Sequence, residues 1–394
     1  MLPGFVSCLW EATRHFHATA LVLLPNMLLL STMSNKPTLG NRSSTTRRPA
    51  YSAALGAPDP AFEKLRKLLP PRWRFSADRR PLPSAPEGTL RLVAPDRTTA
   101  TWCVQAKPRL DPKDARNLSQ PRTDPSGTPL LVAPFLSPRT REILDRGGAN
   151  YLDRTGNIRL ASERPALFIL SRGADVNPLP TAQGTRSLKG PKAGRIIRAL
   201  CDFLPPIGVR ALAARTGTDP GYCSRVLDLL DREDLIKRTK GSVIEVNWKS
   251  LIERWAQDFK PLERKRTRSY LATRGLPGVL EKLAKSRVRY AVTGAFAAAW
   301  LAPVAPPRLL ICYADDPELA AATLDLRPAE AGINVLLVTP FDSTVYERTW
   351  QRDNIRCAAP SQIAVDLLNS PGRGPQEAEG LMKWMAENER AWRS

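Results

Sequence analysis

The sequence has few of the residues from which catalytic and metal sites are commonly built. His15 and His17 are its two histidines among 394 residues, and its six cysteines include no CxxC pair. The sequence therefore predicts neither a catalytic histidine nor a zinc knuckle. The scattered cysteines predict no disulfide framework. We expect no bound metal, no cofactor and a reducing, cytoplasmic setting.

The sequence also has no apolar run long enough to cross a membrane. The stretch at residues 18–30 is thirteen residues long and is interrupted by Pro25 and Asn26, whereas a span needs roughly 20 residues. We expect no membrane association. We also expect translation to start at Met33, so that residues 1–32 are an upstream extension and the working protein contains no histidine.

Acidic residues are outnumbered. The chain carries 59 Lys and Arg against 38 Asp and Glu, giving a formal net charge of +21 and a pI of about 10.2. This balance favours a polyanionic partner, first of all double-stranded DNA, although an acidic protein surface would satisfy it equally well. With 42% hydrophobic residues, the chain is long and apolar enough for two or three domains.

Changes in composition divide the chain into segments, and the overall fold class is expected to be α/β combined with α+β. Residues 33–60 are rich in Pro, Ser, Thr and Arg and have no apolar period, which is typical of disorder. The expected segments are an upstream extension (1–32), a disordered basic arm (33–60), a first α/β domain (61–173), a linker (174–192), a helix-turn-helix segment (193–259), a basic linker (260–274) and a C-terminal α/β domain (275–390).

The clearest pattern is a helix-turn-helix at residues 194–231. Two amphipathic helices, 194–204 and 209–215, precede the turn Thr216-Gly217-Thr218. Asp219-Pro220 then supplies a cap and a first residue for a third helix. Its apolar residues recur at i, i+3, i+4 and i+7, which leaves Tyr222, Ser224 and Arg225 exposed near its N-terminal end. Short β-prone runs at 235–238 and 243–246 follow and predict a hairpin with a basic tip.

The segment VRALAARTGTDPGYCSRVLDLLDREDLIKR resembles winged helix-turn-helix repressors of the IclR and MarR type, over about 55 residues. The resemblance implies that Tyr222, Ser224 and Arg225 read the major groove. It implies phosphate contacts from Arg210, Arg215, Lys237, Arg238 and Lys240. The alternative is a winged helix that serves as a protein-interaction module.

The first α/β domain contains a nuclease-like motif. Pro95-Asp96 and Gln105-Ala106-Lys107 resemble the PD-(D/E)xK signature, with Gln105 in place of the second acid. Because that chemistry needs two acidic oxygens to hold a divalent metal, we expect a restriction-endonuclease-like fold that has lost cleavage. The open alternative is an active nuclease using Asp96, Gln105 and Lys107. The segment 148–160 resembles one that follows this core in restriction-endonuclease-like domains of bacterial regulators.

The C-terminal domain resembles the opening of the nucleotidyltransferase fold at residues 290–316. Ala295 stands where that fold has serine, and residues 308–313 carry no carboxylate. Asp315-Asp316-Pro317 is more typical of a turn and helix cap, so nucleotidyl transfer is not expected. Together with the helix-turn-helix, residues 359–385 resemble AbiEi-type antitoxins of type IV toxin–antitoxin systems. That resemblance implies a winged helix that represses the operon and a C-terminal domain that handles antitoxicity.

We therefore expect a sequence-specific DNA-binding transcriptional regulator, with an autorepressing antitoxin as its more specific form. A homodimer is expected because such readers commonly bind paired half-sites. Two alternatives stay open. One is a metal-dependent nuclease that the winged helix targets to DNA, and the other is an antitoxin that acts by contact with a toxin protein.

Overall fold

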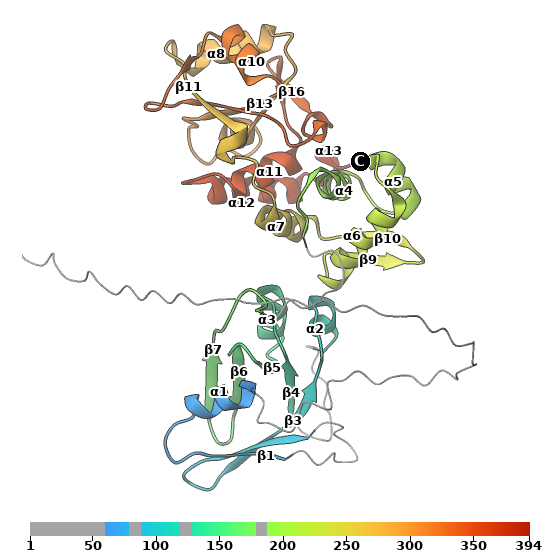
Figure 1. Cartoon of the computed structure of the whole chain (residues 1–394), viewed down its shortest axis with the longest axis vertical. Helices are drawn as coiled ribbons and strands as arrows, with labels where there is room; N and C mark the ends of the chain where they lie inside the picture. Colours follow the sequence, from blue (N-terminus) through green and yellow to red (C-terminus); the bar gives the residue numbers. More distant parts are fainter. Residues whose placement is uncertain (1–59, 79–87, 119–127, 179–186) are drawn as a thin grey trace, which may run out of the picture. The chain divides into compact units, whose positions relative to one another are not determined.

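The computed structural model describes residues 60–78, 88–118, 128–178 and 187–394. The predictions for residues 1–32 and 33–59 lie outside the described residues, as does part of the predicted linker, residues 179–186. The described chain has a mixed α/β fold (Figure 1). Within it, no helix combines the length and the apolar character that crossing a membrane requires.

The first domain, residues 60–178, is built on a seven-stranded sheet in the order β1-β2-β3-β4-β5-β6-β7. Strands β3, β4 and β5 run parallel to one another and the other neighbours are antiparallel. The elements are α1 (Pro60–Leu68), β1 (Arg74–Asp78), β2 (Thr89–Val93), β3 (Thr99–Ala106), α2 (Pro112–Leu118), β4 (Thr128–Ala133), α3 (Pro138–Arg146), β5 (Asn150–Asp153), β6 (Ile158–Ser162) and β7 (Leu167–Ser171).

Alternating apolar residues give this sheet a separate core on each face. Helix α1 contributes Ala61 and Leu65 to one core, where they meet Leu90, Leu92 and Trp102. The second core contains residues of β4 and β5 together with the helical residues Ala115 and Leu144, so α2 and α3 cover that face over the middle of the sheet. The other face of β1 and β2 carries the exposed residues Arg74, Ser76 and Arg91.

The central segment, residues 187–259, has its elements in the predicted order. Helix α4 begins at Pro191, earlier than expected, because proline is well suited to the first helical position. The elements are α4 (Pro191–Asp202), β8 (Ile207–Gly208), α5 (Val209–Thr216), α6 (Pro220–Arg232), β9 (Ile236–Thr239), β10 (Ser242–Val246) and α7 (Trp248–Asp258). The three strands form a sheet in the order β8-β10-β9.

The C-terminal segment, residues 260–394, contains a second seven-stranded sheet in the order β14-β11-β15-β13-β12-β17-β16. Its elements are η1 (Arg264–Arg266), β11 (Thr267–Leu271), α8 (Gly275–Lys285), β12 (Tyr290–Thr293), α9 (Gly294–Ala299), β13 (Leu310–Ala314), α10 (Pro317–Leu324), β14 (Arg327–Pro328), β15 (Val335–Val338), η2 (Ser343–Tyr346), β16 (Trp350–Arg352), β17 (Ile355–Cys357), α11 (Pro360–Leu368), α12 (Gly374–Glu387) and α13 (Glu389–Trp392).

Residues 260–274, predicted as a basic linker, are corrected by this topology. They include β11, which lies between β14 and β15 in the sheet. The strand buries Tyr270 while Arg268 projects into solvent. Arg268 is the one basic residue within β11, whereas Arg264, Lys265 and Arg266 form η1 before it. A count of charges cannot distinguish this arrangement from a linker.

The central and C-terminal segments share one hydrophobic core. Helix α4 approaches the C-terminal segment so closely that a Cβ on Gly194 would lie 2.8 Å from the Phe341 ring. Buried Arg198 pairs with Asp202 on the same helix and donates to the Gln362 side chain of α11 at 3.1 Å. Because α4 packs against the C-terminal segment within this single core, residues 187–394 fold as one body.

Candidate nucleic-acid interface

Helix α6 is fixed at its N-terminus by the turn that precedes it. Asp219 caps the helix by accepting a hydrogen bond from a first-turn backbone N–H at 2.9 Å. Gly217 ends α5 at φ 58°, a left-handed conformation that glycine adopts without strain. The Thr218 hydroxyl lies 2.7 Å from the Thr216 hydroxyl and 2.9 Å from Cys223 Sγ. These contacts fix the turn between α5 and α6.

The predicted base-reading residues lie together on the outer face of α6. The inner face is buried in the shared core through Cys223, Val226, Leu227, Leu229 and Leu230. On the outer face Arg225 is exposed, while Tyr222 and Ser224 are partly exposed. The Arg225 guanidinium lies 5.8 Å from the centroid of the Tyr222 ring, which restricts its orientation. The first two turns of α6 therefore present one cation, one phenol and one hydroxyl to solvent.

Two of the predicted phosphate-contacting residues are neutralised by acids. Lys237 of β9 forms an ion pair with Glu245 of β10 at 2.6 Å, and Arg238 forms one with Asp228 of α6. Sequence reasoning missed both acids, because Asp228 reaches β9 through tertiary packing of α6 and Glu245 meets Lys237 through an irregular strand register. These two basic residues are therefore less available to phosphates than their sequence positions indicate.

The other three differ in how freely they project. Arg215 lies flat on the protein, with its guanidinium 3.7 Å from the centroid of the Phe203 ring. Arg210 and Lys240 are exposed, and neither forms an ion pair with any described residue. Arg210 sits in the first turn of α5 and Lys240 at the tip of the β9–β10 hairpin. These two are the cations best placed for phosphate contact.

The hairpin tip places Lys240 in an uncommon conformation. Lys240 and Gly241 have φ values of 50° and 81°, and they join the paired residues Thr239 and Ser242. Such two-residue turns strongly favour Asn-Gly, because a positive φ is costly for other side chains. The lysine therefore occupies a position that its own backbone preference does not explain.

The predicted nuclease residues are not brought together. Asp96 is an exposed residue of the β2–β3 turn, where the Thr98 hydroxyl and backbone N–H donate to it at 2.6 and 2.9 Å and lower its pKa. Gln105 and Lys107 lie at the other end of β3, about 20 Å away at the rise of an extended strand. The structure thus assembles no metal site from Asp96, Gln105 and Lys107.

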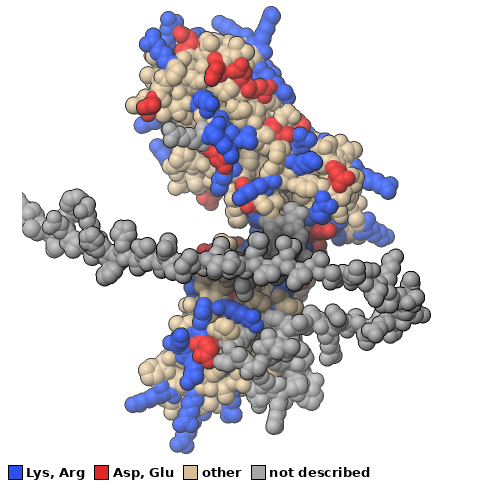
Figure 2. All heavy atoms as spheres, viewed as in Figure 1, with Lys and Arg blue, Asp and Glu red and all other residues tan. Residues whose placement is uncertain are grey.

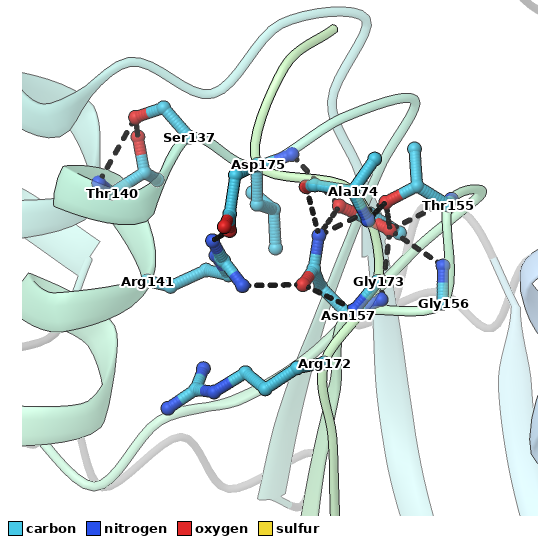
Figure 3. Close-up of polar contacts among 12 residues, drawn as sticks. Ser137, Thr140, Arg141, Thr155, Gly156, Asn157, Arg172, Gly173, Ala174 and Asp175 are labelled. Carbon is cyan, nitrogen blue, oxygen red and sulfur yellow. Dashed lines mark hydrogen bonds and ion pairs between the residues drawn. The ribbon is translucent and has the colours of Figure 1, made fainter. Parts of the chain in front are cut away.

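The polar residues of segment 148–160 form a structural lock (Figure 3). Asp153 is buried, and its two carboxylate oxygens accept six hydrogen bonds, four of them from backbone N–H groups. The side-chain oxygen of Asn157 accepts from Arg141 and from the Gly173 N–H. Arg141 also pairs with Asp175. Since each group is used to join α3, the β5–β6 turn and the end of β7, the cluster serves the fold.

The nucleotidyltransferase-like acids are also occupied. Asp316 caps α10, which confirms the predicted turn and cap, and Asp315 accepts a hydrogen bond from the Tyr346 hydroxyl at 2.9 Å. Strand β12 is antiparallel to β13 and pairs Thr293 with Ile311. The acids, which follow β13, therefore lie at the opposite end of this strand pair from the turn at Gly294.

One buried carboxylate in the C-terminal segment carries an electrostatic cost. Asp366 of α11 accepts hydrogen bonds from Thr293 at 2.6 Å, Tyr313 at 2.9 Å and Gln362 at 2.8 Å, and no cation touches it. Burial raises its pKa to about 7, against the opposing effect of the three donors and of Arg198. This network lies in the core, so it supports the shared body rather than an open site.

Among the described residues, no cluster of His, Cys, Asp and Glu could hold a metal ion. Comparisons with family models, with curated proteins and with solved structures find no match. A functional assignment therefore depends on the geometry of the described residues. The clearest candidate site among them is the outer face of α6.

Proposed function

We propose that the chain is a sequence-specific, double-stranded-DNA-binding transcriptional regulator in which residues 187–259 act as a winged helix-turn-helix. The observation that carries this proposal is the outer face of α6. Tyr222, Ser224 and Arg225 project from its first two turns, while Asp219 and the buried hydroxyl contacts hold the helix in place. These turns are where recognition helices present their base-contacting side chains.

Each exposed residue then has a defined task. Arg225 can donate two hydrogen bonds to guanine O6 and N7, the commonest specific contact in the major groove. Its cation–π contact with Tyr222 reduces the freedom that it would lose on binding. Arg210 and Lys240 bind phosphates on either side and set the position of α6 without reading sequence.

In this proposal the other two domains have structural roles and no catalytic ones. The first domain is a restriction-endonuclease-like fold without cleavage, and the C-terminal segment is nucleotidyltransferase-like without transfer. An AbiEi-type antitoxin that represses its own operon is the more specific form. A homodimer would present two copies of α6 to paired half-sites.

The test is competition binding of the full chain to the DNA upstream of its own gene. Labelled duplex is titrated with protein in the presence of excess random-sequence duplex, for the wild type, Arg225→Ala and the control Arg373→Ala. Arg373 is an exposed loop residue that loses the same charge without touching α6. We expect Arg225→Ala to lose about 10- to 100-fold of discrimination and the control to lose none.

Two outcomes would overturn the proposal. Equal discrimination by wild type and Arg225→Ala would remove α6 as the reader. DNA from the same titrations is also incubated with Mg²⁺ and run on a denaturing gel. Mg²⁺-dependent cutting that Lys107→Ala abolishes would make the chain a nuclease, whereas intact DNA agrees with a regulator.

A further inference from the structure

The positive charge of the chain is not concentrated on the segment proposed to read DNA. Residues 60–178 contain 21 Lys and Arg against 12 Asp and Glu, while residues 187–259 contain 13 against 9. The central segment also neutralises part of its charge through the pairs of Lys237 and Arg238. The first domain therefore holds the larger excess of positive charge, and the proposed reading surface does not use it.

Four arginines of the first domain gather at one end of its sheet. Arg74 and Arg91 lie on the exposed face of β1 and β2, where Arg91 pairs with Ser76, two residues along from Arg74. Residues two apart on a strand share a face, so these two side chains are diagonal neighbours. Arg72 directly precedes β1, and Arg97 lies in the β2–β3 turn next to the pair Arg74 and Val93. We call these four residues the basic end.

None of the four arginines of the basic end forms an ion pair with a described acidic side chain. Arg72, Arg74, Arg91 and Arg97 are all exposed. Asp96, the acid in the same turn, uses its carboxylate on Thr98. Figure 2 shows Lys and Arg side chains projecting from the part of this domain where β1 lies in Figure 1, with little acidic surface beside them. The contrast with the paired cations of the β9–β10 hairpin is direct.

The backbone supplies a second, independent observation. Arg72 is the third residue of a turn closed by a hydrogen bond from Trp73 N–H to the Pro70 carbonyl, and its φ is 77°. Arg97 follows a turn with proline at its second position and has a φ of 70°. Both conformations are those that glycine normally takes in such turns. Arginine raises the cost of each turn, so local folding does not explain its presence.

The chemistry of this end favours phosphate over an apolar protein partner. The exposed strand positions beside Arg91 are Ser76 and Thr101, which are hydrogen-bonding side chains typical of contacts to phosphate and sugar. Aromatic and apolar anchors, which dominate protein interfaces, are not among them. Of the nuclease-like residues only Asp96 lies at this end, in the same turn as Arg97, while Gln105 and Lys107 lie at the opposite end of β3.

We infer that the basic end is a second, sequence-independent binding surface for the phosphate backbone of double-stranded DNA. This inference takes its ligand from the function proposed above and adds a separate surface to it. The four guanidinium groups neutralise phosphates beyond those bound by the central segment, so they add affinity and salt dependence without adding sequence preference.

The experiment measures affinity against salt for the full chain on a long duplex that contains the preferred site. A variant with Arg72, Arg74, Arg91 and Arg97 all changed to glutamine is compared with a control in which Lys285, Arg287, Arg373 and Lys383 are changed to glutamine. All four control residues are exposed and unpaired within the described chain. We expect the plot of log affinity against log salt to become shallower by about 3.6 in the first variant, since each of the four lost phosphate contacts removes about 0.9. The control should change it by less than 1.

A second pair of variants separates binding from folding. Arg72→Gly and Arg97→Gly relax the left-handed positions, so each protein should melt at the same temperature as the wild type or higher. Each should also bind the long duplex several-fold more weakly. A loss of binding together with a gain of thermal stability cannot come from a damaged fold.

The outcomes distinguish this inference from the proposed function. If Arg225→Ala leaves discrimination unchanged while the glutamine variant flattens the salt plot, the proposed reader fails and the basic end stands as a DNA-binding surface. An unchanged salt plot in the glutamine variant overturns the inference, and so does an equal change in the control. Unchanged DNA binding with lost binding to polyglutamate assigns the surface to an acidic protein, which overturns it too.

Discussion

The basic end of the first domain and the β9–β10 hairpin of the body formed by residues 187–394 differ in how their cations are paired. At the surface of the first domain, the basic end leaves four arginines without acids, whereas the β9–β10 hairpin pairs Lys237 and Arg238. In the interior, the better-satisfied charge belongs to the first domain. Its buried Asp153 accepts six hydrogen bonds, whereas buried Asp366 of the C-terminal segment accepts three. The first domain thus has the cations that are free to attract an anion, and the C-terminal segment has the buried carboxylate that lowers stability when it is ionised.

The largest effect should come from Asp366. Its pKa is raised from 3.8 to about 7 in the folded protein, so between these values the folded state holds a proton that the unfolded state has released. The free energy of unfolding should therefore fall as pH rises from 4 to 7, by up to about 4 kcal/mol, and then level off. Asp366→Asn removes this contribution.

Urea unfolding at pH 5 and pH 8 measures the effect. The wild type should lose more stability between these pH values than Asp366→Asn does, and the difference between the two proteins isolates the one carboxyl from all others. An equal loss in both proteins would show that ionisation of Asp366 does not destabilise the fold. The contrast drawn above between the buried Asp153 and Asp366 would then fail.

A smaller loss should follow from Asp153→Asn in the first domain. An amide keeps one acceptor oxygen but turns an NH₂ group toward backbone N–H donors, which leaves buried groups unsatisfied and costs about 3 kcal/mol. The matched control is Glu163→Gln in the same domain, because Glu163 is an exposed acid outside this cluster. Hydrogen exchange of residues 148–160 should accelerate in Asp153→Asn alone. Protection equal to that of the wild type would mean that the lock does not hold this turn.

Periodicity in the sequence predicted the central helices well, because one face of each is buried. Helices α4, α5 and α6 lie where the spacing of their apolar residues places them. Strand β11 was missed because it contains Arg268 and directly follows a run of basic residues. Strand β5 was missed because its four residues, all buried, include the polar Asn150 and Asp153. Burial of polar residues depends on tertiary hydrogen bonds, which no local pattern contains.

The candidate surface was predictable only in part. Exposure of Arg225 follows from helical spacing, but the pairing of Lys237 does not. A regular hairpin would set Lys237 opposite Ile244, whereas an irregularity between Val243 and Glu245 shifts the register and brings Glu245 opposite it. A one-residue change of register decides which charges meet.

The ion pair between Lys237 and Glu245 can be removed by mutation, which would make the cations of the hairpin more like the unpaired arginines of the basic end. Glu245→Gln should free Lys237, so that the hairpin gains one available cation. The plot of log affinity against log salt should then steepen by about 0.9. Glu379→Gln, which removes an exposed acid from α12, controls for net charge. A slope unchanged from that of the wild type would show that Lys237 already releases Glu245 when DNA binds.

The smallest effect should come from Lys240→Asn at the tip of the same hairpin. Asparagine adopts the left-handed conformation more readily than lysine, and Asn-Gly is the preferred pair for this turn. The variant should therefore be more stable by about 0.5 kcal/mol, seen as a rise in melting temperature. It should also lose one phosphate contact, which flattens the salt plot by about 0.9. Arg97→Gly makes the corresponding change in the first domain, so opposite movements of stability and affinity in both hairpins would show that each turn carries its cation for binding. A fall in both quantities for Lys240→Asn would instead assign Lys240 to the fold, leaving the basic end as the sole surface with this property.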